Sequence, residues 1–376
     1  MQRDITPVLP VSVLTLAGRP LPVFGTARMY VCGVTPYDVT HLGHAATFVW
    51  ADTAARVLRH LGHAVQVCRN VTDVDDVLFE AAGRAGEPYD RLAAVQQFYF
   101  DRDMEALRVR RPEHEPRAHN FIPQVIALSQ ALLSAGAAYQ AHGSVYFRGA
   151  DAVARAGVDP AEAARRLGAA GDPAGEPGKL DALDVAVWRS SSGDQPAWPS
   201  PWGPGRPGWH AECAAMSLST FGPALDLHCG GADLRFPHHV FEAAQAEAVT
   251  GVTPFARAWM HVGTVSIDGA KMAKSTGNLV LVKDLLAGSS PAAIRLMLLR
   301  RHYGQEWEYT PPAISEAEQQ LAELYAAASR PSTTDNADEA ARARLADDLD
   351  VTGALDIAVS AGGSTARRLI ETLALA

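Results

Sequence analysis

Apolar positions follow two different patterns over the first part of the chain. Residues 29–32 form a short apolar run that is typical of a buried strand, and the apolar residues that follow recur at helical spacing. These are Leu42, Ala46, Trp50, Ala54, Val57 and Leu61. Gly62 predicts the end of this helix, and residues 64–68 form a second strand-like run. The order predicts a βαβ unit with a parallel sheet, in which ligands bind beyond the carboxyl ends of the strands.

The middle of the chain predicts helices and then an interruption. Residues 88–138 show helical periodicity, whereas a stretch rich in Gly, Ala and Pro over residues 150–179 breaks it. We interpret residues 115–190 as an insertion into the α/β domain. Strand-like and loop segments return over residues 225–263.

The last part of the chain is predicted to be helical. Amphipathic helices are predicted over residues 291–302 and 313–328, and SRPSTTDNADEA, which begins at Ser329, is predicted to be a flexible linker. The predicted organisation has three parts: a catalytic α/β domain over residues 1–255, a region with a lysine-rich loop over residues 256–328, and a short helical bundle over residues 329–376.

The composition is that of a globular, enzyme-sized protein. The chain has 376 residues, 48% of them hydrophobic, which is enough for a large core. With 33 basic and 42 acidic residues the net charge is −9, which argues against a dedicated nucleic-acid binder. The four cysteines lie far apart, no secretory signal pattern is present, and no apolar run reaches roughly 18 residues. We therefore expect a cytoplasmic protein that does not enter a membrane.

The first candidate for chemistry is His41-Leu42-Gly43-His44 at the start of the first predicted helix. Unpaired N–H groups and the helix dipole favour an anion there, and two imidazoles could hydrogen-bond a triphosphate. Gly43 would allow close approach of the nucleotide. Taken alone, such a short motif is more often a pair of surface histidines.

The second candidate is a loop that carries Lys271 and Lys274 between Gly269 and Gly277. Two ammonium groups on a mobile loop can stabilise charge on a phosphate while pyrophosphate leaves. A short lysine-rich loop is usually only solvated surface. The two motifs in this order, about 230 residues apart, are much more specific than either alone.

The third candidate is a set of zinc-ligand residue types, Cys32, Cys213, His238 and Glu242. His238 and Glu242 are four residues apart and would share one helical face. The wide spacing differs from that of a zinc finger, so a metal would join distant strand ends, as in catalytic sites. A zinc ion with an open position could bind a substrate thiolate and reject serine. The alternative is that the cysteines are ordinary core residues.

Taken together, the motifs resemble those of the class I cysteinyl-tRNA synthetase family. The matching segments, which extend from Met29 to Ser275, are MYVCGVTPYD, HLGH, NVTDVDD, LDALDVAVW, GWHAECAAM, DLRFPHH and KMAKS. The span from the first of these segments to the last is about two-thirds of the chain. The resemblance implies an α/β fold: a class I aminoacyl-tRNA-synthetase-type Rossmann catalytic domain with an insertion, followed by a C-terminal helical region.

The resemblance also implies the site. Catalysis would involve His41, His44, Lys271 and Lys274, and zinc would be held by Cys32, Cys213 and His238, with Glu242 left open as a fourth ligand. The cysteinyl adenylate would contact residues from four parts of the chain: Cys32, Gly33, Val34, Thr35 and Thr47; Asn70, Val71 and Thr72; Trp209; and Gly231, Ala232, Asp233 and Val265. ATP would enter as substrate together with Mg²⁺.

Within the family, CGVTPYDVTHLGHAATF and KMAKSTGNLVLV most resemble the ligase branch that joins cysteine to glucosaminyl-inositol in mycothiol biosynthesis. The small-molecule substrates would be cysteine, ATP and an amino-sugar inositol, and we expect a monomer. About 100 residues follow the lysine loop, too few for a full anticodon-reading domain, so tRNA is not the expected acceptor.

The sequence departs from the family pattern at Ala273 in the lysine loop and in the HCGGAD turn. Three alternatives therefore stay open: a true cysteinyl-tRNA synthetase, a cysteine ligase with another amine acceptor, and an inactive homologue that binds or regulates. Loss of ATP–pyrophosphate exchange would identify the last of these.

Overall fold

The computed structural model describes residues 13–272, 277–333 and 335–376. Its centre is a four-stranded sheet in the order β10-β9-β3-β4, in which every neighbouring pair is parallel. The strands are β3 (Thr26–Val34), β4 (Ala64–Val71), β9 (Leu225–Gly231) and β10 (Ala256–Val262). Helix α1 (Leu42–His60) connects β3 to β4. This arrangement confirms the predicted α/β fold class.

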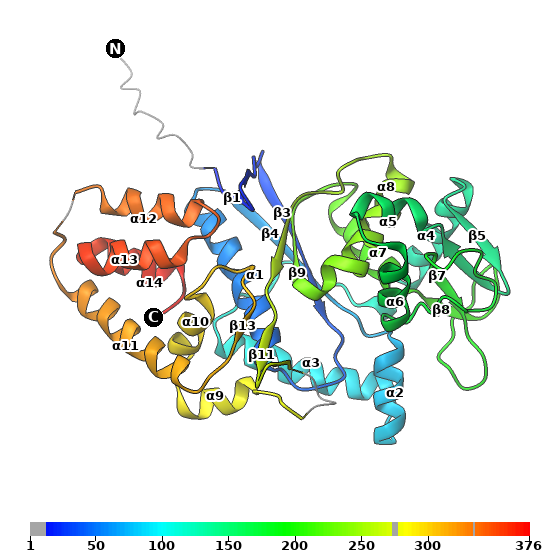
Figure 1. The fold of residues 1–376 in the computed structure, drawn as a ribbon, viewed down its shortest axis with the longest axis horizontal. Coiled ribbons are helices and arrows are strands. Elements are labelled where there is room, and N and C mark those ends of the chain that lie inside the picture. The colour runs from blue at the N-terminus through cyan, green and yellow to red at the C-terminus, as the bar shows by residue number, and fades with distance from the viewer. Residues whose placement is uncertain (1–12, 273–276, 334) are drawn as a thin grey trace, which may run out of the picture.

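Alternate residues of β3 face two separate hydrophobic clusters, because successive side chains of a strand point to opposite faces. Met29 and Val31 pack with α1 and the C-terminal helices, while Tyr30 and Cys32 pack with helices that cover the other face. Those helices include α7 (Trp209–Phe221) and α8 (Val240–Thr250). The sheet is therefore the middle of three layers, with α1 on one side and α7 and α8 on the other (Figure 1).

The insertion forms the end of the molecule farthest from the C-terminus (Figure 1). It holds an antiparallel sheet in the order β5-β6-β7-β8. Its elements are α4 (Ile122–Ser134), β5 (Ala138–Ala141), β6 (Ser144–Phe147), α5 (Ala150–Ala156), α6 (Pro160–Ala169), β7 (Val185–Ser190) and β8 (Gly205–Pro207). Since β8 pairs with β7, this unit extends past residue 190, the predicted end of the insertion. Helices α5 and α6 lie within the stretch that was predicted to lack periodicity. The periodicity is weak there because each helix is short and buries only two apolar side chains.

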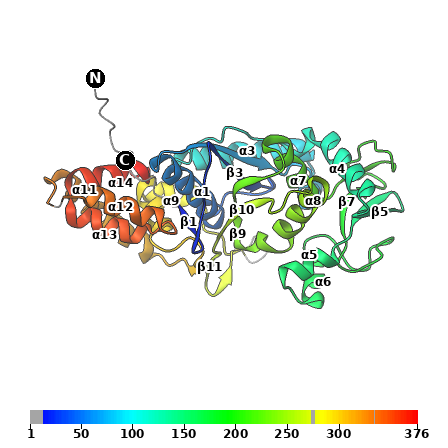
Figure 2. The same cartoon turned by 90° about the horizontal axis from the view of Figure 1, so that it is seen from above.

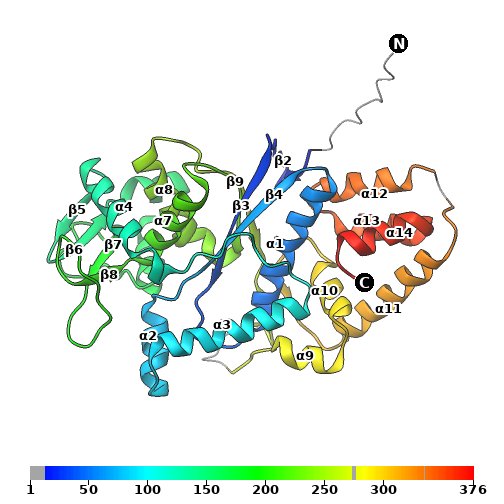
Figure 3. The ribbon, with the colours of Figure 1, turned by 180° about the vertical axis from the view of Figure 1, so that it is seen from behind.

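In the chain, α2 (Asp76–Ala85) and α3 (Tyr89–Ala106) follow β4 and precede the insertion, and both helices lie along one edge of the molecule (Figure 3). Residues 88–138, which were predicted to be helical throughout, are not one continuous helical segment. Residues 107–117 follow the end of α3 and extend beside β4. Val71 donates its N–H to the Pro116 carbonyl at 2.9 Å, and the Arg69 N–H donates to the His114 carbonyl at 3.0 Å.

The C-terminal region is a group of helices packed beside α1 (Figures 1 and 2). A small sheet of β11 (Val265–Ile267), β12 (Ala270–Lys271) and β13 (Trp307–Glu308) joins it to the central sheet. The helices are α9 (Val282–Gly288), α10 (Pro291–Leu299), α11 (Pro312–Ser329), α12 (Ala337–Ala346), α13 (Val351–Ala361) and α14 (Gly363–Thr372). The predicted linker is too long at its C-terminal end, because Ala337 already begins α12.

At the N-terminal side, the hairpin of β1 (Thr15–Leu16) and β2 (Arg19–Pro20) lies against the helical region. Thr15 forms a bridge with Asp347, and the Ala17 N–H donates to the Asp348 carboxylate at 2.8 Å. Among the described residues, no helix has the length and apolar character needed to cross a membrane.

Candidate active site

A cavity of about 830 Å³ lies at the carboxyl edge of the central sheet, which is the edge where parallel sheets bind their ligands. The end of β3, the N-terminus of α1, the end of β9 and the segment after β10 form its walls. Among its lining residues are many of those predicted for catalysis and adenylate binding: Cys32, Gly33, Thr35, His41, His44, Thr47, Gly231, Asp233 and Val265. The structure thus brings together motifs that are far apart in the sequence.

The ends of β3 and β4 support this cavity from behind. The Gly33 N–H donates to Asn70 Oδ1 at 2.8 Å, Asn70 Nδ2 donates to Thr72 Oγ1 at 3.0 Å, and the Thr72 N–H donates to the Val34 carbonyl at 3.1 Å. Asn70 and Thr72 are buried, as are Val34 and Val71. These four predicted adenylate contacts do not line the cavity, so the structure places them in its supporting wall.

The N-terminus of α1 presents two histidines to the cavity. His41 is the N-cap, and its Nδ1 accepts the Gly43 N–H at 3.1 Å; His44 Nδ1 accepts the His41 N–H at 3.5 Å. The rings stack with centroids 3.8 Å apart. With both Nδ1 atoms as acceptors, each ring can donate from its Nε2. Two donors at a helix N-terminus form a site suited to phosphate oxygens.

The turn after β9 forms another wall of the cavity, near Thr47 of α1. Glycine at residue 231 leaves room for the Asp233 carboxylate, since a Cβ there would lie 2.5 Å from Asp233 Oδ1, whereas its 3.9 Å distance to Thr47 Oγ1 would be an ordinary contact. Ala232 belongs to the same turn but does not line the cavity. A carboxylate in this place is suited to accept hydrogen bonds from ribose hydroxyls.

The lysine loop begins beside the same cavity. The backbone of Lys271 is in β12 and pairs with Ser266 of β11, and the next residue, Met272, lines the cavity. Lys274 and Ala273 lie outside the described residues.

Next to the cavity is a buried set of four side chains that could bind a metal ion. Cys32, Cys213, His238 and Glu242 each offer a ligand atom, and these atoms all lie within 4.8 Å of one another. The Cys32 and Cys213 sulfurs are 4.0 Å apart, close to the roughly 3.8 Å expected for two thiolates on one tetrahedral zinc ion. Cys32 also lines the cavity, so the set is connected to it.

These four side chains come from four elements. Cys32 is near the end of β3 and Cys213 is in α7, while His238 lies in η3 (Arg235–His239), a short helical segment that leads directly into α8, where Glu242 lies. Trp209, at the start of α7, stacks on the His238 ring with centroids 4.2 Å apart. Trp209 therefore borders the metal-ligand set, rather than lining the larger cavity.

Burial shapes the protonation of this set. It raises the pKa of the Cys32 thiol and of the Glu242 carboxyl well above their ordinary values, and it lowers the pKa of His238. Thiolates and carboxylates at such a depth need a compensating positive charge. A divalent cation provides that charge and favours the deprotonated ligands.

Three more histidines surround the set and were not singled out from the sequence. His228 Nε2 lies 3.0 Å from both oxygens of Glu242, His210 Nδ1 lies 3.0 Å from His238 Nδ1, and His239 Nδ1 lies 2.9 Å from His261 Nε2. His228 and His239 form, with Cys32 and Glu242, a second group of possible ligands. The concentration of histidines over residues 210–261 was the only sequence signal for this environment.

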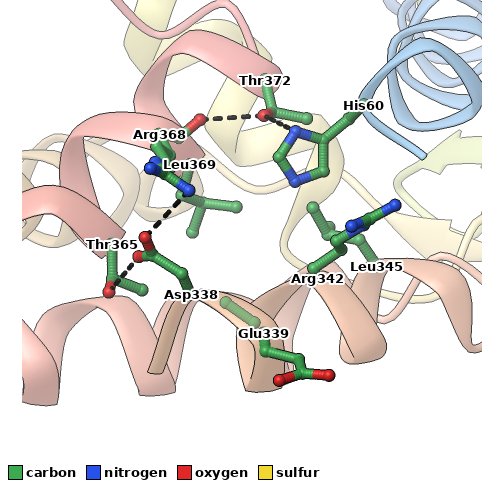
Figure 4. A pocket seen from close by; sticks show the side chains of 10 residues that line it. His60, Asp338, Glu339, Arg342, Leu345, Thr365, Arg368, Leu369 and Thr372 are labelled. Atoms are coloured by element: carbon green, nitrogen blue, oxygen red, sulfur yellow. Dashed lines mark hydrogen bonds and ion pairs between the residues drawn. The ribbon is translucent and has the colours of Figure 1, made fainter. Parts of the chain in front are cut away.

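A separate cavity of about 300 Å³ lies at the C-terminal end of α1, between α12 and α14 (Figure 4). Asp338 joins Thr365 and Arg368 across it, and Thr372 hydrogen-bonds His60 at 3.4 Å. None of the predicted site residues lines this cavity. It is at the opposite end of α1 from His41 and is separate from the candidate active site.

The fold and the site together define a class of protein: a nucleotide-binding α/β protein with histidines at a helix N-terminus above a buried Cys/His metal-ligand set. The chain belongs to the class I tRNA synthetase family, because residues 23–319 match the family described as tRNA synthetases class I (C) catalytic domain. This match confirms the family resemblance of the sequence motifs.

Similar proteins refine the place of the chain within this family. It is 48% identical over 348 residues to a Mycobacterium ulcerans protein named L-cysteine:1D-myo-inositol 2-amino-2-deoxy-alpha-D-glucopyranoside ligase, covering 90% of this chain and 84% of the relative. An Acidothermus cellulolyticus protein of the same name is 46% identical over 355 residues, covering 92% and 87%.

Solved structures show the same fold at lower identity. A Mycobacterium tuberculosis methionyl-tRNA synthetase bound by methionyl-adenylate superposes with a TM-score of 0.66 at 18% identity, covering 92% of this chain and 84% of that one. A putative arginyl tRNA synthetase from Campylobacter jejuni gives a TM-score of 0.57 at 12% identity, covering 94% and 90%. At these identities the likeness concerns the fold alone.

Proposed function

We propose that this chain is an ATP-dependent ligase that forms cysteinyl adenylate and transfers cysteine to the amine of glucosaminyl-inositol, releasing AMP and pyrophosphate. The central observation is that Cys32 belongs both to the buried metal-ligand set and to the wall of the cavity under the α1 histidines. The proposed binding site for the substrate thiol is therefore adjacent to the proposed binding site for the phosphates of ATP. The ligase names of relatives that are 46% and 48% identical support the choice of acceptor.

In the first step, the carboxylate of cysteine attacks the α-phosphorus of ATP and pyrophosphate leaves. His41 and His44 donate from Nε2 to phosphate oxygens at the N-terminus of α1, which stabilises the charge that develops there. Asp233 holds the ribose hydroxyls, and Val265 packs near the adenine. Lys271 and Lys274 neutralise the leaving pyrophosphate, and Mg²⁺ enters with ATP.

We propose zinc as the resident metal, held by Cys32, Cys213 and His238. Two buried thiols and an imidazole are a donor set that suits zinc better than Mg²⁺ or Ca²⁺. When bound, zinc supplies an open position for the sulfur of substrate cysteine. Glu242 is close enough to be a fourth ligand, and its contact with His228 also suits it to orient the set from outside.

The second step joins the acceptor amine to the activated carbonyl and releases AMP. We propose that the protein acts as a monomer. The reduced thiols of the set suit the cytoplasm, where we place the protein. The close alternative is transfer to tRNA, which would use the same activation chemistry.

The first experiment measures cysteine-dependent ATP–pyrophosphate exchange with zinc-loaded protein, and then adds glucosaminyl-inositol or tRNA. Formation of a cysteinyl amide of glucosaminyl-inositol, followed by mass, is the expected result. Cysteinyl-tRNA in its place would identify a synthetase, and exchange without either product would indicate another amine. Loss of exchange in metal-replete protein would indicate the inactive homologue.

The metal assignment is tested by zinc content. Cys213→Ala should lose most of its bound zinc, measured by elemental analysis after purification, because one of three proposed ligands is removed. Cys229→Ala is the matched control, since Cys229 is also a buried cysteine but packs on the opposite face of the sheet. Equal zinc content in both variants would contradict the proposed set.

A further inference from the structure

A third cavity, here called the β4-side cavity, lies outside the adenylate site. Its volume is about 290 Å³, and it is lined by Asp73, Tyr89, Asp90, Ala93, Arg117, His119 and Trp198. None of these residues belongs to the activation chemistry proposed above. Their side chains combine two carboxylates, a guanidinium, an imidazole, a phenol and an indole.

Two segments place this cavity next to the site where cysteine is activated. On one side, Asp73 directly follows Thr72, whose N–H donates to Val34 at the end of β3. On the other side, Trp198 exchanges two backbone hydrogen bonds with Gly205, at 2.7 and 3.0 Å. Strand β8 begins at Gly205 and leads through Gly208 to Trp209, which stacks on His238. Both walls therefore continue into the active site.

Asp73 organises the polar side of the β4-side cavity. Its side chain is 4% exposed; it accepts the His119 N–H at 3.0 Å and lies 2.5 Å from His119 Nδ1, and it lies 3.7 Å from the Arg117 guanidinium. Because Nδ1 of His119 faces a carboxylate, its Nε2 points away and can hydrogen-bond a ligand. Among the described residues, none hydrogen-bonds His119 Nε2. His119 is 42% exposed, so a ligand can reach it.

This chemistry suits a hydroxyl-rich ligand. Carboxylates, a guanidinium and an imidazole offer both acceptors and donors to neighbouring hydroxyls, and the flat face of Trp198 can cover the C–H face of a ring. Asp73 and Asp90 outnumber the single guanidinium of Arg117, which favours a neutral or cationic ligand. The phosphates of an RNA acceptor end would be repelled by the two carboxylates.

We propose that the β4-side cavity binds the polyol portion of the amine acceptor, a cationic amino sugar joined to a cyclitol, with Trp198 and His119 as its specificity residues. The proposal rests on the proposed function. Asp73 acts as a positioning residue, because it fixes the ring of His119. The proposed acceptor site is then adjacent to the end of β4, which supports the proposed adenylate site.

The test separates cysteine activation from acceptor use. Trp198→Ala and His119→Ala are compared with Trp202→Ala, a matched control in the same connection between β7 and β8 that packs against Trp188 and does not line the cavity. Exchange of pyrophosphate should stay within about twofold of wild type in all three variants, whereas the KM for glucosaminyl-inositol should rise about tenfold in the first two only.

The outcomes distinguish the two levels of the proposal. Unchanged acceptor KM in both cavity variants, with exchange intact, overturns the assignment of the cavity while leaving the ligase function in place. Exchange without amide formation in the wild type overturns the proposed acceptor. Calorimetric binding of glucosaminyl-inositol gives a readout independent of turnover, and equal affinity in wild type and Trp198→Ala overturns the assignment as well. His119 is exposed, so its variant is expected to fold even if Trp198→Ala does not.

Discussion

Gly33 lies where the ends of β3 and β4 approach most closely. A Cβ at this position would lie 1.5 Å from the Asn70 carbonyl oxygen, and the Gly33 N–H also donates to the Asn70 side chain. Any side chain at this residue would have to separate the two strand ends. The wall of the cavity at the carboxyl edge of the central sheet therefore requires a residue without a side chain here.

Gly33→Ala should accordingly lower pyrophosphate exchange by about a hundredfold or more, because a misplacement of about 1 Å near the reacting groups has effects of that size. Gly83→Ala is the matched control. Gly83 lies in α2, and a methyl group there would meet no atom within 4 Å, so alanine should stabilise that helix by about 0.5–1 kcal/mol. Normal exchange in Gly33→Ala would contradict the close approach.

Asp75 provides a pH-dependent prediction. It caps α2 through the Val77 N–H at 2.8 Å and accepts from Thr35, but burial raises its pKa from 3.8 to about 6. The folded state thus binds the proton more tightly than the unfolded chain does. The free energy of unfolding should fall as the pH rises from about 4 to about 6, and stay lower above that range.

Asp75→Asn should remove this dependence and keep the helix cap. Above pH 7 the variant should be more stable than wild type by about 1 kcal/mol, because the cost of charging the half-buried carboxylate exceeds the one hydrogen bond that is lost. Urea unfolding at pH 4 and pH 8 measures both effects. Asp151→Asn, at an exposed position in α5, is the control, and parallel pH profiles for Asp75→Asn and wild type would contradict the prediction.

At the scale of elements, α1 shows how local sequence and position combine. Its apolar spacing and the stop at Gly62 predicted its extent almost to the residue, because the buried face recurs regularly over 19 residues. The same periodicity could not be seen in α5, with 7 residues, or α6, with 10. The candidate active site contains the N-terminal end of α1, where His41 and His44 line the cavity.

His41→Ala should reduce pyrophosphate exchange by about a hundredfold, because it removes one of two donors at the helix N-terminus. The loss of the cap should cost only about 1 kcal/mol of stability, which separates chemistry from folding. His63→Ala, just beyond the other end of α1, should leave exchange unchanged. A stability loss large enough to explain the fall in exchange would contradict a catalytic role.

At the scale of the whole molecule, Arg295 of α10 joins three parts of the chain. Its fully buried guanidinium donates to Asp52 of α1 at 2.8 Å, to the Leu107 carbonyl at 2.8 Å and to the Leu373 carbonyl at 3.0 Å. The helix that carries His41 and His44 at its N-terminal end is thereby fixed to the C-terminal region.

Arg295→Met should lower the free energy of unfolding by about 3–5 kcal/mol, because it leaves buried acceptors and part of the Asp52 charge without a partner. Arg300→Met is the matched control at the end of the same helix, where a pair with the exposed Glu316 contributes about 1 kcal/mol or less. Urea unfolding of both variants measures the difference. Similar losses in the two would show that Arg295 does not have this joining role.

The sequence by itself determined the elements with regular apolar spacing, the α/β class and the family, because these depend on local periodicity and on motifs whose residues are close together. It also supplied every member of the Cys32, Cys213, His238 and Glu242 set, through residue type and resemblance. Tertiary structure alone decided that His210, His228 and His239 surround that set, that Asn70 and Thr72 support the wall instead of lining it, and that Trp198 meets Asp73 across a cavity. These contacts join residues distant in sequence, and no local pattern encodes which distant side chains will pack together.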